Sequence, residues 1–356
     1  MNKKNYLFLY FLLLTGSIIA QNKTKFSAEI ATWYHDKPGA VSISFDDASY
    51  TQYEYAYPVL EKYGFKATFS LVGTWTHNQA TYSAEPGYFE IKKMGWQEIK
   101  ELHDKGHEIA AHGYEHKKYK KYASVNELTK QMKQVKDLIE KHIQSPVYTL
   151  HYPYSFTSDS IVAASKRAGF LFARTGNEAI NPVTPANMHL LESKAIINNY
   201  YPDDSQFNEW LNQANGKWLI LMYHHLFPEG SKEMKILRYH KVTNTYSLLP
   251  NTFQKQMQVL SGQNAWVAPI ATVGKYVVER EHTKIKLRRF CHRLCIKVST
   301  NLDTAIYNQP LTIKVKLPWK KVKIRKGKES YIYNVKNQTL LLDILPNSKV
   351  IIKKVK

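Results

Sequence analysis

Regular alternation between apolar runs and amphipathic segments is the feature that most limits how this chain can fold. Between residues 40 and 270, short apolar runs predict strands, and helical spacing follows most of them. The predicted strands are AVSISF, KATFSLVG, EIAAH, VYTLHYPY, FLFART, KWLILMYH and AWVAPI, and the clearest helix is SVNELTKQMKQVKDLIEKHI. Strands that alternate with helices are typical of a parallel sheet, so we predict an α/β domain, specifically a barrel.

The pattern changes after residue 283. From Lys284 onward, short strand patterns follow one another without helices between them, which predicts a small all-β sandwich. This part holds 19 Lys and Arg residues against 3 Asp and Glu, a net charge of +16 out of +21 for the whole chain. A shift in composition this sharp indicates a boundary. We therefore predict one domain at residues 21–283 and a basic β-rich module at residues 284–356.

The first 20 residues predict a signal peptide. Lys3 and Lys4 precede an apolar run from Tyr6 to about Leu14, and small residues end at Ala20. This run is shorter than the ~20 residues needed to cross a bilayer, and no later segment is apolar enough to do so. We expect cleavage near Ala20, a secreted or periplasmic (cell-envelope) location, and no transmembrane helix after cleavage.

The basic module has two interpretations. It forms either a solvated strand surface or a surface that attracts an anionic cell-envelope polymer. Because export is expected, nucleic acid is a poor partner, and we predict none.

The chain has only two cysteines, Cys291 and Cys295. Residues four apart on a straight strand lie ~13 Å apart, far beyond the Cα separation of about 7 Å that a disulfide allows. We therefore expect two packed thiols on one strand face, in preference to a disulfide and in preference to a metal site that includes His292.

Polar side chains that could take part in catalysis or metal binding stand at the ends of the predicted strands. The stretch AVSISFDDASY ends its apolar run in two adjacent carboxylates, Asp46 and Asp47. Further such groups end the later strands: His112 and His116, His151, Arg174, and His224 with His225. In (β/α) barrels, the carboxyl ends of the strands carry the chemistry. We therefore predict that these side chains form one site.

The residue types at these strand ends fit metal-assisted hydrolysis. Two imidazoles and one carboxylate form a common shell for a catalytic metal, and His112 and His116 are close enough in sequence to bind one ion. A divalent cation would lower the pKa of a bound water towards ~7. A second carboxylate could act as general base, an acid on the opposite side could protonate the leaving group, and backbone N–H groups could hold the oxyanion. This chemistry cleaves an acyl bond.

Four motifs, SFDDAS, HGYEH, HYPYSF and LMYHH, occur in this order between about residues 38 and 280. In these motifs the chain resembles the polysaccharide deacetylases of carbohydrate esterase family 4, with their NodB-type catalytic domain. The resemblance implies a distorted (β/α) barrel and Zn²⁺ or a similar divalent cation. It also implies a hydrolase that acts on C–N bonds other than peptide bonds and removes N-acetyl (or O-acetyl) groups from an acetylated polysaccharide.

The resemblance assigns roles to individual residues. By analogy, Asp46 is the general base, Asp47 binds the metal with His112 and His116, Tyr154 offers its backbone N–H to the oxyanion, and His224 is the general acid. His225, next in the chain, could exchange roles with His224.

Three positions depart from the family pattern. Ala48 follows the Asp pair where Gly is frequent, and Gly113 stands where Ser or Thr is usual. His151 begins the third motif in place of an Arg that pairs with the base. Arg174, at the end of the next strand, could orient Asp46 instead, with His151 beside it.

Two other functions stay open. A catalytically inactive glycan-binding protein could use the same fold, and the missing Arg favours that interpretation. An amidase acting on a non-sugar amide is the other, because the same site would hydrolyse either bond. Retention of the three metal ligands, of Asp46 and of His224 argues against the inactive protein.

Overall fold

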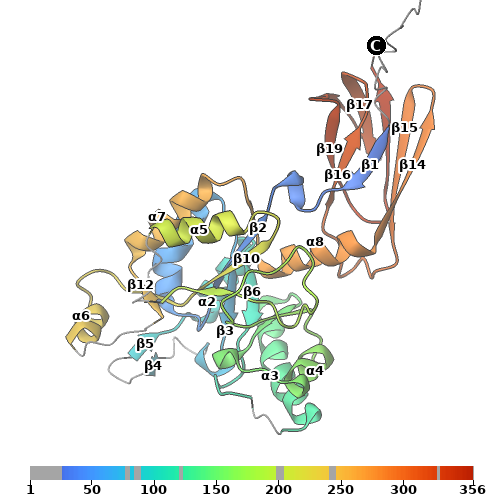
Figure 1. The fold of residues 1–356 in the computed structure, drawn as a ribbon. Coiled ribbons are helices and arrows are strands. Elements are labelled where there is room, and N and C mark those ends of the chain that lie inside the picture. Colours follow the sequence, from blue (N-terminus) through green and yellow to red (C-terminus); the bar gives the residue numbers. More distant parts are fainter. Residues whose placement is uncertain are drawn as a thin grey trace, which may run out of the picture.

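The computed structural model describes residues 26–76, 81–83, 90–119, 123–197, 204–239, 246–326 and 329–355. The signal peptide predicted at residues 1–20 lies outside this part of the chain. Figure 1 shows a mixed region of helices and strands, coloured blue through yellow to the orange of α7 and α8, and a group of mainly orange to red strands at its upper right.

An all-parallel sheet forms the centre of the mixed region. Its strand order is β8-β7-β6-β3-β2-β10-β9, and β13 also pairs with β2. The central strands β2 and β10 are buried along their whole length, as expected of a sheet that is covered on both faces. The strands are β2 (Ala40–Phe45), β3 (Thr68–Leu71), β6 (Glu108–Ala111), β7 (Thr149–His151), β8 (Phe172–Arg174), β9 (Lys194–Ala195), β10 (Trp218–Tyr223) and β13 (Trp266–Val267).

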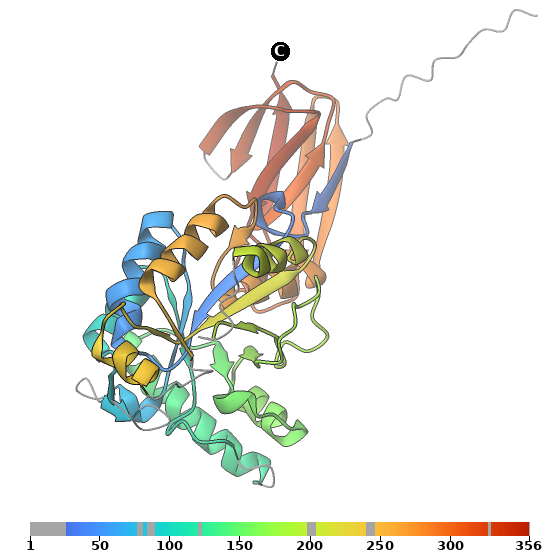
Figure 2. The ribbon, with the colours of Figure 1, turned by 60° about the vertical axis from the view of Figure 1, so that its left-hand side comes forward.

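Helices surround this sheet, which confirms the predicted distorted (β/α) barrel (Figure 2). They are α1 (Tyr57–Tyr63), α2 (Trp96–Asp104), α3 (Val125–Ile143), α4 (Asp159–Arg167), α5 (Asp204–Gln213), α6 (Lys232–Tyr239), α7 (Pro250–Ser261) and α8 (Ile270–His282). The capping box predicted at the start of α3 is present: the Glu127 N–H donates to Ser124 Oγ (3.2 Å), and the Ser124 N–H donates to the Glu127 carboxylate (2.9 Å). No described helix is both long and apolar enough to cross a bilayer.

Two helices, α6 and α8, were not predicted from the sequence. The residues of α8, IATVGKYVVEREH, include β-branched residues and a glycine, which have low helix propensity. Tertiary packing outweighs that propensity here. A Cβ on Gly274 would lie 2.5 Å from the Phe172 ring, so the glycine allows α8 to approach β8 closely.

Short elements complete the mixed region. They are η1 (Tyr34–Asp36), the π-helix η2 (Gln52–Ala56), η3 (Gly73–Trp75), η4 (Pro153–Ser155), β4 (Thr81–Ser83), β5 (Glu90–Lys92), β11 (His225–Leu226) and β12 (Ser247–Leu248).

The C-terminal strands form two antiparallel sheets with a shared apolar core, which confirms the predicted all-β region. One sheet has the order β14-β15-β20-β17-β18, and the other has the order β1-β16-β19. Both contribute buried side chains, such as Ile296 and Ile352 from the first sheet and Ile313 from the second. The strands are β1 (Ser27–Ile30), β14 (Thr283–Phe290), β15 (Arg293–Thr300), β16 (Leu311–Lys316), β17 (Lys321–Lys326), β18 (Glu329–Asn334), β19 (Thr339–Ile344) and β20 (Lys349–Lys354).

The first strand belongs with these C-terminal strands. β1 pairs with β16 and places Ser27 opposite Lys316 and Ile30 opposite Ile313. The sequence analysis had grouped these residues with residues 21–283, because a four-residue edge strand gives no signal of a partner far along the chain. A domain boundary near residue 283 stays a prediction; the chain passes there from α8 directly into β14.

Both cysteines are free, and their environments differ. Cys295 is half-buried on β15, whereas Cys291 is exposed. The prediction that both thiols pack is wrong for Cys291, because β14 ends at Phe290 and Cys291 lies in the turn that follows.

A buried carboxylate lies where α8 meets the loop between β15 and β16. Glu279 is fully buried, and its Oε1 accepts a hydrogen bond from the backbone N–H of Gln309 (2.9 Å). Within the described part of the chain, its other oxygen, Oε2, has no hydrogen-bond partner. Burial raises the pKa of Glu279 to about 7, although the Gln309 N–H and the Lys275 charge act in the opposite direction.

Glu279→Gln is expected to stabilise the protein above about pH 7 by on the order of 2 kcal/mol. Between its ordinary pKa of 4.5 and about 7, the folded protein holds a proton on Glu279 that the unfolded chain has released. The stability from this group is therefore full below pH 4.5 and is lost as the pH rises through about 7. The amide of the variant still accepts from Gln309 and does not titrate.

Urea unfolding at about pH 5 and about pH 7.5 measures this difference. Glu209→Gln, which changes an exposed acid on α5, is the control and should keep the wild-type pH dependence. The assignment is wrong if Glu279→Gln loses stability over this pH interval as steeply as the wild-type protein.

Candidate active site

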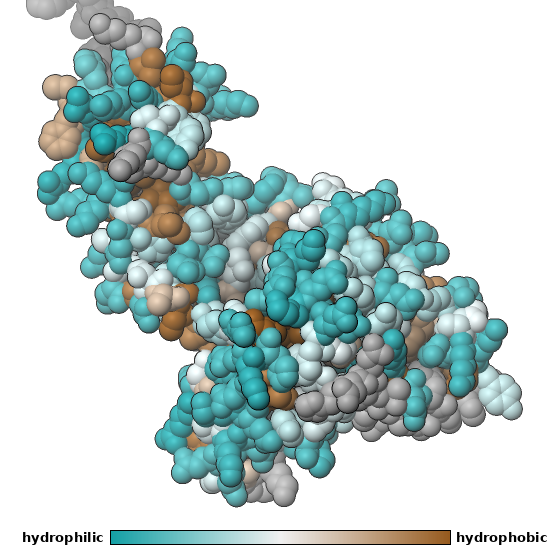
Figure 3. Space-filling model, turned by 180° about the vertical axis from the view of Figure 1, so that it is seen from behind, coloured by the Kyte–Doolittle hydropathy of each residue, from teal (hydrophilic) through white to brown (hydrophobic). Residues whose placement is uncertain are grey.

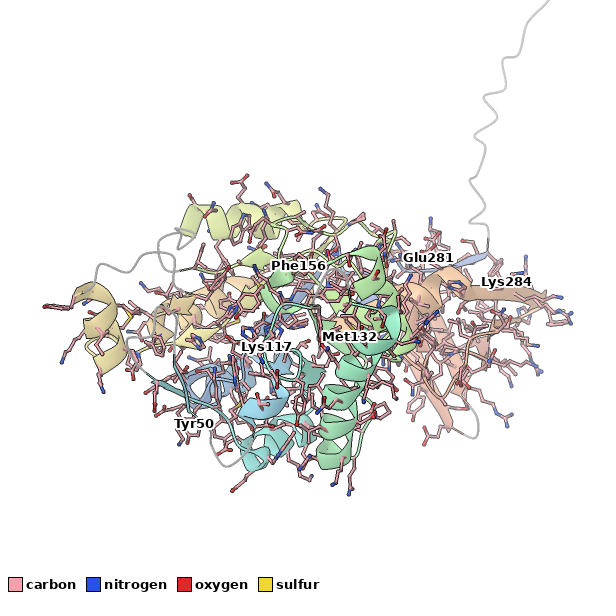
Figure 4. The ribbon with its side chains drawn as sticks, turned by 90° about the horizontal axis from the view of Figure 1, so that it is seen from below. Tyr50, Lys117, Met132, Phe156, Glu281 and Lys284 are labelled. Atoms are coloured by element: carbon pink, nitrogen blue, oxygen red, sulfur yellow. The ribbon has the colours of Figure 1, made fainter. Side chains whose placement is uncertain are left out.

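The predicted site residues meet at the carboxyl edge of the parallel sheet. Asp46 and Asp47 follow β2, His112 follows β6, and His224 follows β10, while His151 and Arg174 end β7 and β8. Parallel neighbours end at the same edge, so residues far apart in sequence come together there. In Figure 4, Tyr50 and Lys117, which directly follow the first two motifs, and Phe156, which ends the third, lie over the α/β region, while Lys284 marks the C-terminal strands at the right.

Asp46 is buried among hydrogen-bond donors. His151 Nδ1 lies 2.7 Å from Asp46 Oδ1, and the Ser70 hydroxyl donates to the same oxygen at 2.9 Å. Arg174 Nη2 donates to both carboxylate oxygens and lies 2.5 Å from Oδ1. The structure thus brings Arg174 and His151 to the carboxylate that the sequence analysis expected them to orient.

These contacts control the protonation of Asp46. Burial raises its pKa, but the charge of Arg174, with His112 and His151, outweighs burial and holds the pKa well below its usual value. Burial and the Arg174 charge lower the pKa of His151 to about 3. At neutral pH, Asp46 is therefore an ionised carboxylate, and the neutral His151 donates to it from Nδ1.

Asp47 faces away from this cluster, towards two imidazoles. Its Oδ1 lies 3.5 Å from His112 Nε2 and 3.4 Å from His116 Nε2, and the two Nε2 atoms are 3.2 Å apart. Among the described residues, this trio is the group of histidine and carboxylate side chains near enough together to hold a metal ion.

The chemistry of this trio fits a divalent cation. Asp47 Oδ1 is buried and has no hydrogen-bond partner among the described residues. His112 donates from Nδ1 to the backbone carbonyl of His151 (2.9 Å), so Nε2 is the ring nitrogen that it turns towards Asp47. Burial lowers the pKa of His116 to about 4, so this imidazole is neutral at pH 7. One carboxylate oxygen and two neutral imidazole nitrogens form the donor set of many catalytic zinc sites.

Several residues around the trio have left-handed backbone conformations. The φ angles are 74° at Asp47, 50° at Ala48, 51° at His116 and 58° at Tyr154. Non-glycine residues rarely adopt such values, and those that do gather at functional sites. Ala48 stands where the family that the chain resembles frequently has a glycine, and its backbone has a positive φ of the kind that glycine adopts most easily.

Tyr154 lies in the η4 turn beside the trio. Its ring centroid is 4.7 Å from that of His116, and 48% of the residue is exposed. The turn therefore places a partly exposed aromatic residue, with its backbone, at the mouth of the site.

The two histidines after β10 face different carboxylates. His224 Nε2 lies 3.7 Å from Asp46 Oδ2, and His225 Nε2 lies 3.9 Å from Asp47 Oδ2. Burial lowers the pKa of His224, with Asp46 and Asp47 acting in the opposite direction. The sequence left the two histidines interchangeable, and the geometry places His224 beside Asp46.

Two residues of the site, Ser70 and Lys93, were not predicted from the sequence. Ser70 on β3 donates to Asp46, and its only signal was a polar residue in a buried strand. Lys93 is fully buried, and its Nζ lies 4.3 Å from the centroid of the Trp75 ring. Burial lowers the pKa of Lys93 to about 8, while the Asp47 charge opposes the shift. Nothing in the local sequence around Lys93 distinguishes it from a surface lysine.

A cavity of about 650 Å³ lies beside the site. Its lining comes from the segments that follow the first and last motifs and from β5: Tyr50, Thr51, Glu54, Glu90, Ile91, Lys92, Phe227, Lys232 and Glu233. Most of the lining side chains are therefore polar or charged, and Tyr50 and Phe227 are the aromatic residues among them.

Residues 34–173 match the family model described as Polysaccharide deacetylase. The predicted resemblance is thus confirmed, and the chain contains a polysaccharide deacetylase domain of the NodB type. The match ends one residue before Arg174 and includes Asp46, Asp47, both histidines of the trio and Tyr154.

Similar proteins include the poly-beta-1,6-N-acetyl-D-glucosamine N-deacetylase of Staphylococcus aureus. It is 27% identical over 166 residues, which cover 43% of this chain and 54% of that enzyme, so the chain spans about half the length of this relative. Among solved structures, the deacetylase PplD of Streptococcus pyogenes is 24% identical with a TM-score of 0.39, and covers 49% of this chain and 69% of its own. The pseudoenzyme BA3943 of Bacillus anthracis is 15% identical with a TM-score of 0.42, and covers 67% and 66%.

Proposed function

We propose that this chain is an exported, zinc-dependent hydrolase that removes acetyl groups from a polysaccharide. The observation that carries this proposal is the division of labour between adjacent carboxylates. Asp46 is ionised and held by Arg174, His151 and Ser70, whereas Asp47 presents to two imidazoles an oxygen that has no hydrogen-bond partner among the described residues. A proton acceptor and a metal-binding trio thus lie next to each other.

In this proposal, Asp47, His112 and His116 hold the cation. A cation bound there would supply Lewis acidity, which would lower the pKa of a bound water and polarise the acetyl carbonyl. Asp46 accepts the proton of that water as general base. The backbone N–H of Tyr154 donates to the oxyanion that develops on the carbonyl oxygen.

His224 completes the reaction as general acid. When the C–N bond breaks, the leaving amine takes a proton from His224, and acetate is the other product. Burial lowers the pKa of His224, while the charges of Asp46 and Asp47 act in the opposite direction and favour the protonated imidazole that this role needs. For an O-acetyl substrate the leaving group would be an alcohol, and the same residues would act.

The substrate that we propose to test first is a β-1,6-linked N-acetylglucosamine polymer, because the staphylococcal relative is named for it. The polar cavity beside the motifs is where we place its neighbouring sugars. We propose a secreted or periplasmic (cell-envelope) location for the enzyme, and a cell-envelope anion as the partner of the basic C-terminal strands.

Metal removal tests this function. The wild-type protein is expected to bind about one Zn²⁺ per chain, and chelation should abolish acetate release from the polymer until zinc is restored. Asp47→Ala should lose the bound zinc and the activity together, because it removes the only carboxylate of the trio. Zinc content by elemental analysis and acetate release by a coupled assay are the measurements.

The matched control is Asp137→Ala, which removes an exposed carboxylate on α3 and should change neither quantity. Full acetate release from the chelated protein would exclude the metal mechanism. Zinc binding without acetate release from any acetylated glycan would favour the inactive glycan-binding protein, and release from simple amides alone would favour the amidase. Arg174 at Asp46 weakens the case for inactivity, because it supplies the cation that His151 does not.

A further inference from the structure

The five-stranded sheet of the C-terminal module has one buried face and one solvent face. Its buried face carries apolar residues of alternate positions, including Ile296 on β15, Ile324 on β17 and Ile352 on β20. The residues between them point to the opposite side, because successive side chains on a strand alternate. The strand register places Arg293 opposite Lys353, and Lys353 opposite Lys323, so these side chains share the solvent face.

This solvent face, called the basic face below, carries ten cations. They are Lys284, Lys286 and Arg288 on β14, Arg293 and Lys297 on β15, Lys349 and Lys353 on β20, and Lys321, Lys323 and Arg325 on β17. Among the described residues of the five strands, no Asp or Glu lies on this face. Ordinary solvated surfaces intersperse both signs of charge, so a face of one sign indicates an anionic partner.

Two large apolar side chains stand among these cations. Phe290 ends β14 on the basic face, opposite Arg293, and is 58% exposed. Ile332 lies on the edge strand β18, opposite Lys323, and is 60% exposed. Figure 3 shows the end of the molecule that holds these strands, at its upper left, as hydrophilic surface interrupted by brown apolar patches. Contact with a hydrophilic polymer would not bury these apolar side chains, whereas a lipid surface would take them up below its headgroups.

The extent of the basic face also favours a planar partner. Five strands span about 19 Å, and the cations along one strand cover about 14 Å. A single polymer chain would contact one row of this grid. We propose that the basic face docks the enzyme on an anionic lipid bilayer, with the cations at the headgroups and with Phe290 and Ile332 reaching below them.

Docking in this way leaves the candidate active site accessible. The C-terminal strands lie at one end of the molecule, while α6, β4 and β5, which flank the carboxyl edge of the sheet, lie at the other (Figure 1). The inference does not depend on the proposed deacetylation, since the ten cations and the two apolar residues lie outside the site.

Vesicle binding tests the proposal, with the chain from residue 21 onward, which contains every described residue. Wild-type protein is expected to cosediment with phosphatidylcholine vesicles that contain about 30% phosphatidylglycerol, and to bind pure phosphatidylcholine at least about 50-fold more weakly. Binding should weaken as salt is raised. Each Lys or Arg near such a surface strengthens binding about fivefold.

The triple variant Arg293→Glu, Lys323→Glu, Lys353→Glu should therefore bind the anionic vesicles at least about 100-fold more weakly. Its matched control, Lys105→Glu, Lys130→Glu, Lys255→Glu, changes the net charge equally at exposed positions off the face and should lose less than about threefold. Phe290→Ser should lose about tenfold on vesicles and nothing on soluble dextran sulfate. Circular dichroism and acetate release from a short soluble glycan show that each variant is folded.

Two results would overturn the proposal. One is equal binding of wild-type protein to neutral and anionic vesicles. The other is loss of dextran sulfate binding in the triple variant while vesicle binding is unchanged, which would identify a polymer as the occupant.

Discussion

Asp46→Asn is expected to lower the rate of acetate release by about 10²–10⁴-fold while the protein keeps its bound zinc. The amide fills the same space but cannot accept the proton of the attacking water. Asp46 lies outside the metal-binding trio, so the donor atoms of Asp47, His112 and His116 remain in place. The turnover number and the zinc content of the same preparation measure the two halves of this expectation.

Asp137→Asn, an equivalent change at an exposed carboxylate, is the matched control and should leave turnover unchanged. Near-normal turnover of Asp46→Asn at neutral pH would show that another residue is the base. His151 is then the first residue to test, because its Nδ1 lies 2.7 Å from Asp46 and its buried Nε2 has no hydrogen-bond partner among the residues that the structure describes.

Arg174→Met should destabilise the protein by about 3–5 kcal/mol and abolish most of its activity. The side chain is 1% exposed and donates to both oxygens of Asp46. Without it, the buried carboxylate keeps His151 and Ser70 as donors, but the cation that holds its pKa low is gone. The pKa of Asp46 should rise, so residual activity should shift to higher pH.

Denaturant unfolding of three variants isolates this ion pair. Arg167→Met, at the exposed end of α4, is the matched control and should change stability by less than about 0.5 kcal/mol. The double variant Asp46→Asn, Arg174→Met should recover part of the stability, because no buried charge is then left unpaired. If Arg174→Met does not fold, Arg174→Lys, which keeps the charge, should fold and retain intermediate activity. Equal losses in Arg174→Met and in the double variant would mean that Arg174 contributes packing alone.

Much of the fold could be predicted from the sequence, because most strands and helices have a clear local pattern of apolar residues. Apolar runs such as AVSISF and WLILMY are buried on both faces of the parallel sheet, so their local composition reports their environment directly. The start of α3 could also be predicted from local sequence, because the two capping residues Ser124 and Glu127 lie within one turn of each other. The helix α8 was missed because its residues favour strands, and packing against the sheet outweighs that preference.

The candidate site likewise contains residues that could be predicted from the sequence and residues that could not. Asp46, Asp47, His112 and His116 belong to short motifs, and a motif places its own residues by local geometry. Lys93 carries no local signal, and Ser70 carries only that of a polar residue in an apolar strand, because burial beside a carboxylate is what makes each one unusual. The choice between His224 and His225 likewise needed the distances to the two carboxylates.

The sequence by itself determined the alternation of most strands and helices, the carboxylate pair after β2, the candidate ligands Asp47, His112 and His116, and the accumulation of cations after residue 283. Each of these depends on residues that are near one another in the chain or on composition. Only the tertiary structure decided that Arg174, 128 residues from Asp46, supplies the cation that the third motif lacks. It also decided that β1 joins the C-terminal strands and that ten cations share one face, because strand pairing sets both and the local sequence does not encode the partner.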